Sequence, residues 1–166
     1  NGMGFLAAHP ASDSFHASPA DADRYKNFGE KVDPYIAMLG AEFMHHGAQQ
    51  KARLVCADPA FPGFAELKDG VELLEEWYAL KDFAQDMHVL LVQETRGMNG
   101  PLYLRPRYPS TWARMHGKGR VFYTSLGHRE DIWLNPTFQN ILTGAIAWAT
   151  RNADADIKPN LADFAP

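Results

Sequence analysis

The sequence of 166 residues contains a single cysteine, Cys56, so no disulfide can form within the chain and no cysteine cluster can hold zinc. It also lacks any apolar run near the roughly 20 residues that a membrane-spanning helix needs. Its 16 basic residues stand against 20 acidic ones and form no Lys/Arg cluster. This charge distribution argues against nucleic acid or an anionic membrane surface as a partner.

The composition is that of a folded domain. Hydrophobic residues make up 46% of the chain and charged residues 22%, a balance that excludes a disordered chain. The length predicts one domain that buries its own core. The chain opens at Asn1 and is already apolar at Phe5, which predicts a processed precursor or a start inside a larger domain. No signal peptide is visible, so the compartment stays open.

Short apolar or alternating runs predict the strands. Gly4–Ala8 is continuously apolar and is followed by a His-Pro pair, which favours a buried strand of the kind found in parallel sheets. Residues 71–80 fit a helix or a strand equally well, whereas 96–109, with its Gly and Pro breaks, predicts a long loop. The other predicted strands span residues 51–57, 87–93, 111–115 and 120–125, the last two joined as a hairpin by a Gly-Lys-Gly turn.

Apolar residues at three- and four-residue steps predict two amphipathic helices. The first spans residues 25–39, with Asp33-Pro34 placed to cap and open a second helix within it and Gly40 to end it. The second begins at an Asn-Pro pair and spans 135–151, and the polar tail 152–166 is predicted to be extended. Strands mixed with helices indicate the α/β class.

Three of the seven histidines follow predicted elements. His9 follows the first strand, His46 lies just past the first helix and His128 follows the last strand. Because ligands of α/β sheets bind beyond the carboxyl ends of strands, we expect these three to converge on one site. The alternative is that they are ordinary loop histidines without a function. His88, inside a predicted strand, is a weaker candidate, and so are His16, His45 and His116.

Glu75 and Glu76 stand beside two aromatic residues, Trp77 and Tyr78. Aromatic faces with polar neighbours suit sugar rings, and a carboxylate there can act as a general acid or base. The alternative is a solvated glutamate pair with Trp77 in the core. Imidazoles with or without a carboxylate also bind zinc and similar ions, but the sequence has no His-Glu-x-x-His spacing.

Covalent catalysis has no support in the sequence. Cys56 lies within a strand pattern, without a Gly-x-Cys-x-Gly turn to expose its thiol, and is expected to be a buried small hydrophobe. No Gly-x-Ser-x-Gly elbow is present. Gly117-Lys118-Gly119 lacks the other residues of a phosphate-binding loop, so a hairpin turn explains it.

Several segments, in order, carry a family resemblance. The most specific runs from Gly117 to His128 (Gly-Lys-Gly-Arg-Val-Phe-Tyr-Thr-Ser-Leu-Gly-His), and it is followed by Trp133, an Asn-Pro-Thr-Phe motif and Ala-Trp-Ala. Gly4–His9, Leu39–His46 and Glu75–Tyr78 add three shorter motifs. Together they resemble the ThuA-like (trehalose utilisation) family over about residues 2–151.

The resemblance implies a flavodoxin-like, class I glutamine amidotransferase-like fold of three α/β/α layers. It implies a ThuA-like domain over 1–151 and a role in bacterial sugar catabolism, with trehalose-type or keto-disaccharide substrates. The amidotransferase nucleophile of that fold would lie near His9, where no Cys stands, so glutaminase activity is not expected. The resemblance also implies site residues: His9, Glu76 and His128 as catalytic groups, Trp77 and Tyr78 at the sugar, and His9, His46 and His128 as ligands of a divalent metal such as zinc.

Two departures from the family pattern matter. Family members carry strands before the segment that resembles Gly4–His9, and this sequence has none there. We therefore expect the first strand to lie inside its sheet, beside strands supplied from outside this sequence or by another chain. Glu75 also stands where the family has Asp, which leaves its role open.

The preferred interpretation is an enzyme, a hydrolase or isomerase that acts on a small sugar. The first alternative is a non-catalytic carbohydrate-binding or accessory domain of a larger protein. A structural or partner-binding domain is the second. Convergence of His9, His46, His128 and Glu76 in one pocket would favour the enzyme.

Overall fold

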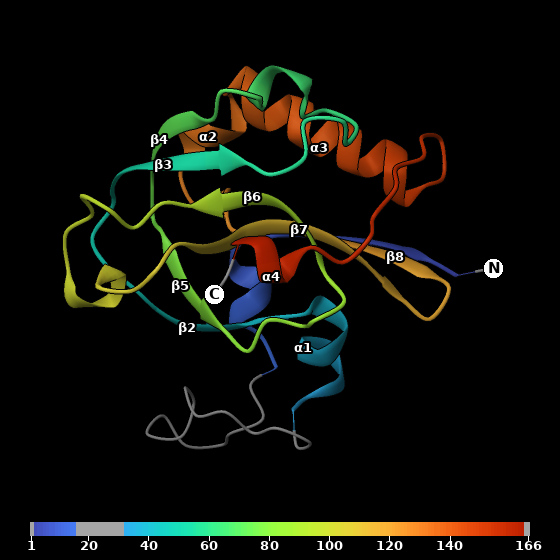
Figure 1. The fold of residues 1–166 in the computed structure, drawn as a ribbon, viewed down its shortest axis with the longest axis horizontal. Coiled ribbons are helices and arrows are strands. Elements are labelled where there is room, and N and C mark those ends of the chain that lie inside the picture. The colour runs from blue at the N-terminus through green and yellow to red at the C-terminus, as the bar shows by residue number, and fades with distance from the viewer. Residues whose placement is uncertain (1, 16–31, 165–166) are drawn as a thin grey trace.

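The computed structural model describes residues 2–15 and 32–164. A six-stranded sheet has the order β1-β8-β7-β6-β3-β4, and β2 pairs with β5 in a second, small sheet (Figure 1). The strands are β1 (Gly4–Ala8), β2 (Glu42–His46), β3 (Gln50–Cys56), β4 (Val71–Glu75), β5 (Tyr78–Lys81), β6 (His88–Gln93), β7 (Tyr108–His116) and β8 (Gly119–Thr124). The helices are α1 (Pro34–Leu39), α2 (Glu130–Trp133), α3 (Pro136–Ala149) and α4 (Leu161–Phe164), with 3₁₀ turns η1 (His9–Asp13), η3 (Ala65–Leu67) and η4 (Pro101–Tyr103).

The predicted α/β class is confirmed. β1 runs parallel to β8, and the other strand pairs of the main sheet are antiparallel. Ala8 is in register with Thr124, so β1 and β8 end at the same level. This register brings the residues that follow the two strands, His9 and Ser125, side by side.

Each face of the main sheet carries a hydrophobic core. Along β8, Phe122 belongs to the core on the α3 face, and the next residue, Tyr123, belongs to the core on the other face. This alternation follows from the two-residue period of a strand. Figure 1 shows α3 above the sheet, with α1 and the small sheet below it. The buried stripe of α3 is the predicted one, with Phe138 and Trp148 among its members.

The helix start predicted at Asp33-Pro34 and the stop predicted at Gly40 are confirmed for α1. The Asp33 side chain accepts the backbone N–H of Tyr35 at 2.8 Å, and Pro34 opens the helix. Gly40 ends it with a left-handed φ of 102°, a conformation that glycine adopts without a steric penalty. The first part of the predicted helix, residues 25–31, lies outside the described residues.

The structure decides one stretch that the sequence left open and corrects another. Residues 71–80 form two strands, β4 and β5, that belong to different sheets, with Glu76 and Trp77 between them. The predicted loop 96–109 is shorter than expected, since it contains η4 and β7 begins at Tyr108. Tyr108 is paired with Gln93 of β6. The strand therefore includes Pro109, although the sequence predicted that this proline belongs to a loop.

The tail is docked on β6. The ring nitrogen Nδ1 of His88 lies 2.7 Å from the carbonyl of Lys158, and the Asn160 side chain pairs with the backbone of Val89. The extended prediction is wrong at residues 161–164, which form α4 because Leu161 is buried in the core. Across the described part of the chain, no helix is long and apolar enough to cross a membrane.

β1 forms one edge of the six-stranded sheet as described, with β8 as its neighbour. The expectation that β1 is an interior strand, completed from outside this sequence, therefore stays a prediction.

Candidate active site where β1, β5 and β8 meet

His9 stands at a strained point of the backbone, directly after β1. Its φ is 36°, in the left-handed region that non-glycine residues rarely adopt. Its Nδ1 lies 2.8 Å from the carbonyl of Ser125, and its own carbonyl accepts the hydroxyl of Tyr123 at 3.1 Å. The parallel register of β1 and β8 thus holds the imidazole in one orientation.

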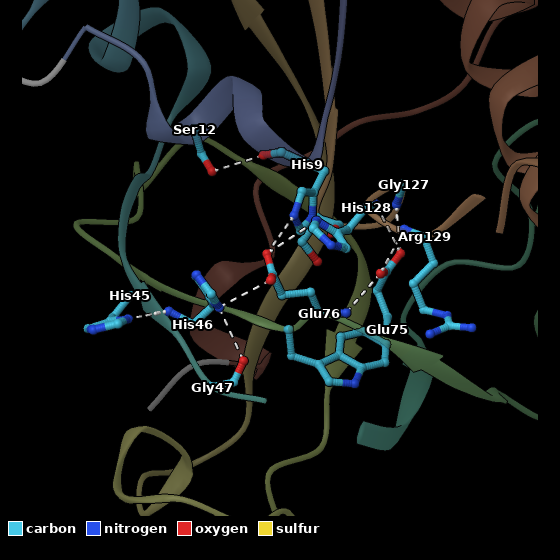
Figure 2. Close-up of polar contacts among 12 residues, drawn as sticks. His9, Ser12, His45, His46, Gly47, Glu75, Glu76, Gly127, His128 and Arg129 are labelled. Atoms are coloured by element: carbon cyan, nitrogen blue, oxygen red, sulfur yellow. Dashed lines mark hydrogen bonds and ion pairs between the residues drawn. The ribbon is translucent and has the colours of Figure 1, made fainter. Parts of the chain in front are cut away.

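Glu76 joins the three histidines that the sequence predicted to converge (Figure 2). Its Oε2 lies 3.3 Å from Nε2 of His9 and 3.3 Å from Nδ1 of His128. Its Oε1 lies 3.2 Å from Nδ1 of His46. The side chain of Glu76 is 13% exposed, so it faces the protein and still has access to solvent.

Glu75 has a different role from its neighbour. It is fully buried, and its carboxylate accepts the backbone N–H groups of Gly127 at 2.9 Å, His128 at 3.2 Å and Arg129 at 3.2 Å. Figure 2 shows these bonds running from the Glu75 carboxylate to the segment of Gly127, His128 and Arg129. Glu75 therefore fixes the loop after β8 and, with it, the position of His128.

The protonation of His9 follows from its surroundings. Burial lowers the pKa of His9, although the Ser125 carbonyl and the carboxylates of Glu75 and Glu76 act in the opposite direction. A carbonyl only accepts, so Nδ1 carries the proton in the neutral ring and Nε2 presents its lone pair to Glu76. Two acceptors that face each other accommodate a cation between them.

His9, Glu76 and His128 are also the residues whose geometry fits a metal ion. One ligand atom from each lies within 4.8 Å of the others. Two imidazoles and a carboxylate form a donor set that zinc and similar divalent cations take in proteins.

The comparisons with known proteins decide the family. The family model described as trehalose utilisation, ThuA, matches residues 1–149. The chain belongs to the ThuA family. Comparison with curated proteins finds no match.

Two solved structures share the fold of this ThuA-family chain. A ThuA-like protein from Bacteroides uniformis ATCC 8492 is 19% identical with a TM-score of 0.64, and the match covers 90% of this chain and 59% of that one. A ThuA-like protein from Parabacteroides merdae ATCC 43184 is 18% identical with a TM-score of 0.61, covering 96% and 64%. The chain thus spans about three fifths of the length of these structures.

His46 takes a different place in this cluster from the one predicted. It ends strand β2, where a position just past a helix was expected. Its Nδ1 lies 3.1 Å from the carbonyl of Gly47 as well as 3.2 Å from Glu76, so this nitrogen carries a proton and donates. His46 therefore orients the carboxylate, and the role of metal ligand predicted for it does not fit this arrangement.

The predicted sugar-lining role of Trp77 and Tyr78 is wrong for Trp77. Its indole is fully buried in the core and donates to the carbonyl of Gln50 at 2.7 Å. Tyr78 is 5% exposed, and its ring packs against the His9 imidazole at a centroid distance of 3.9 Å. Tyr78 thus packs against the imidazole of His9, and its own exposed surface is too small for much contact with a sugar.

The other histidines that the structure describes, His45, His88 and His116, lie outside the cluster. The ring of His45 accepts the backbone N–H of His46, and His88 pairs with Asp58 at 3.0 Å. His116 is exposed at the end of β7. His16 lies outside the described residues. Sequence reasoning missed Glu75 as the residue that holds the loop, although its place beside Glu76 was visible.

Proposed function

We propose that this chain acts in sugar catabolism on trehalose-type or keto-disaccharide substrates, through the cluster of His9, Glu76 and His128. Membership of the trehalose utilisation family supports the substrate class. The observation that carries the proposal is the convergence of these three side chains from separate parts of the sequence. The backbone strain at His9 and the burial of the Glu75 carboxylate that binds the N–H of His128 both cost folding free energy. Such costs are retained at functional sites.

The donor set supports a divalent cation as the cofactor. His9 would supply Nε2, His128 would supply Nδ1 and Glu76 would supply a carboxylate oxygen. A bound divalent cation would act as a Lewis acid toward a carbonyl or hydroxyl oxygen of the sugar. The Ser125 carbonyl accepts a hydrogen bond from the other ring nitrogen, Nδ1, and so orients the imidazole of His9. Histidine ligands commonly have such a hydrogen-bond partner.

In the alternative mechanism without a bound cation, the carboxylate of Glu76 is the candidate general base. It lies within hydrogen-bond reach of three imidazoles and keeps some exposure to solvent, which a group that takes a proton from substrate requires. The N–H of His46 on Oε1 stabilises the charged form of the carboxylate. Proton transfer of this kind serves hydrolysis and isomerisation of a keto sugar alike, so both reaction classes belong in the test.

Metal analysis of the intact protein, paired with turnover assays on trehalose and 3-keto-disaccharides, tests the proposal. We expect the wild type to retain about one zinc per chain after dialysis and His128→Ala to lose both metal and turnover. His116→Ala, a histidine variant at an exposed position outside the cluster, is the matched control. Unchanged metal content and turnover in His128→Ala would contradict the proposal. Sugar binding without turnover in the wild type would instead identify a carbohydrate-binding module.

A further inference from the structure

We propose that the open hollow beside His128 binds an uncharged sugar ring and selects against phosphorylated sugars. The hollow, of about 440 Å³, is lined by Gln49, His128, Arg129, Glu130 and Asp131. Its size falls within the range of small-molecule sites, roughly 300–1,000 Å³. The inference rests on the proposed function, because His128 is shared with the cluster described above.

The wall of the hollow is fixed in place by polar contacts. The Arg129 guanidinium donates to both carboxylate oxygens of Asp131, at 2.8 and 3.1 Å, and to the side-chain oxygen of Gln49 at 2.6 Å. The backbone N–H of Arg129 is held by the buried Glu75. This arrangement positions the polar groups before a ligand arrives, which lowers the entropic cost of binding.

Glu130 is the group left available for a ligand. Its side chain is exposed, and among the described residues its carboxylate has no hydrogen-bond or ion-pair partner. A carboxylate accepts two hydrogen bonds at once, so it can take both hydroxyls of a vicinal diol. Neighbouring hydroxyls of this kind are the recurring feature of a sugar ring.

The charge of the hollow decides between neutral and phosphorylated sugars. Glu130 and Asp131 contribute two negative charges against the one positive charge of Arg129, whose guanidinium already pairs with Asp131. A phosphate group placed here would face the unpaired Glu130 carboxylate, and like charges brought together at a binding site are unfavourable. A free disaccharide meets no such repulsion.

Calorimetric titration of the full chain with trehalose and with trehalose 6-phosphate at low salt tests the inference. We expect trehalose 6-phosphate to bind about tenfold more weakly than trehalose. Glu130→Gln should weaken trehalose binding by about tenfold, because hydrogen bonds to a charged acceptor are lost. Glu130→Lys should remove or reverse the preference against the phosphate. Glu66→Gln and Glu66→Lys, at an exposed glutamate outside the hollow, are the matched controls.

Two results would overturn the inference: equal affinity of the wild type for both sugars, or trehalose affinity in Glu130→Gln equal to that of Glu66→Gln. Zinc content separates this failure from that of the proposed function. Glu130 lies outside the ligand set, so its variants should keep the metal of the wild type. If the wild type holds no zinc, the proposed function fails, and the titrations still report on the hollow.

Discussion

The carboxylate of Glu75 accepts the backbone N–H of His128 at 3.2 Å, so a buried side chain at the end of β4 fixes a site residue more than fifty positions away. The adjacent Glu76 points the other way, toward the imidazoles of His9, His46 and His128 (Figure 2). The two neighbouring glutamates thus have different contacts: Glu75 holds the loop after β8, and Glu76 faces the three histidines.

The first prediction concerns this support. Glu75→Gln should destabilise the fold by about 2–3 kcal/mol, because a neutral amide accepts the buried N–H groups of Gly127 and His128 less strongly. Glu72→Gln, an exposed glutamate on the same strand, should cost less than about 1 kcal/mol. Urea unfolding measures both. Equal midpoints for the two variants would show that Glu75 does not hold the loop.

The second prediction separates the roles of two histidines. His128→Ala should lower zinc affinity by more than about 100-fold, because a ligand is removed. His46→Ala should lower it by about tenfold, since only the partner that orients Glu76 is lost. Competition with a chromophoric chelator gives both constants. A loss in His46→Ala as large as that in His128→Ala would place His46 among the ligands.

The third prediction follows from the burial of Trp77. Trp77→Phe should destabilise the fold by about 1–3 kcal/mol, because it opens a cavity and leaves the Gln50 carbonyl without its donor. Sugar affinity should stay unchanged. Trp133→Phe, at an indole that is 48% exposed, should cost less than about 1 kcal/mol. A loss of sugar affinity in Trp77→Phe without loss of stability would restore the sugar-lining role.

The fourth prediction is a pH dependence at Cys56. Burial raises the pKa of its thiol to about 11, so the reactive thiolate is scarce at pH 8. Iodoacetamide should react roughly 100-fold more slowly with the folded chain than with the chain in urea, where the thiol has its ordinary pKa. The rate should rise with pH up to about pH 11. Equal rates at pH 8 would contradict the effect of burial. Because the pKa is raised on folding, ionisation of Cys56 favours the unfolded chain as the pH rises above about 9.

Local signals predicted much of the fold. The Asp-Pro pair at residues 33–34 and Gly40 predicted the ends of α1, and the spacing of apolar residues predicted α3. These features depend on neighbours within one or two turns, so the sequence displays them directly. Residues 71–80 were ambiguous because β4 and β5 pair with different strands, and only those distant partners decide between helix and strand.

The candidate site divides in the same way. Position after predicted strands was sufficient to select His9 and His128, and the family resemblance selected Glu76. They were not sufficient to assign Trp77, because an aromatic side chain beside a carboxylate fits a sugar pocket and a core equally well. Trp77 lies in the short link between β4 and β5. Its side chain points from this link into the core, and this direction decides between the two roles.

The sequence by itself determined the α/β class, the family resemblance and the chemical groups available for the site, because these follow from composition, local periodicity and motif. Tertiary structure alone decided how those groups are used. The parallel register of β1 and β8 sets His9 against Ser125, and the change of sheet after β4 turns Glu75 inward and Glu76 toward the histidines. Such roles depend on contacts between residues far apart in the chain, which no local pattern encodes.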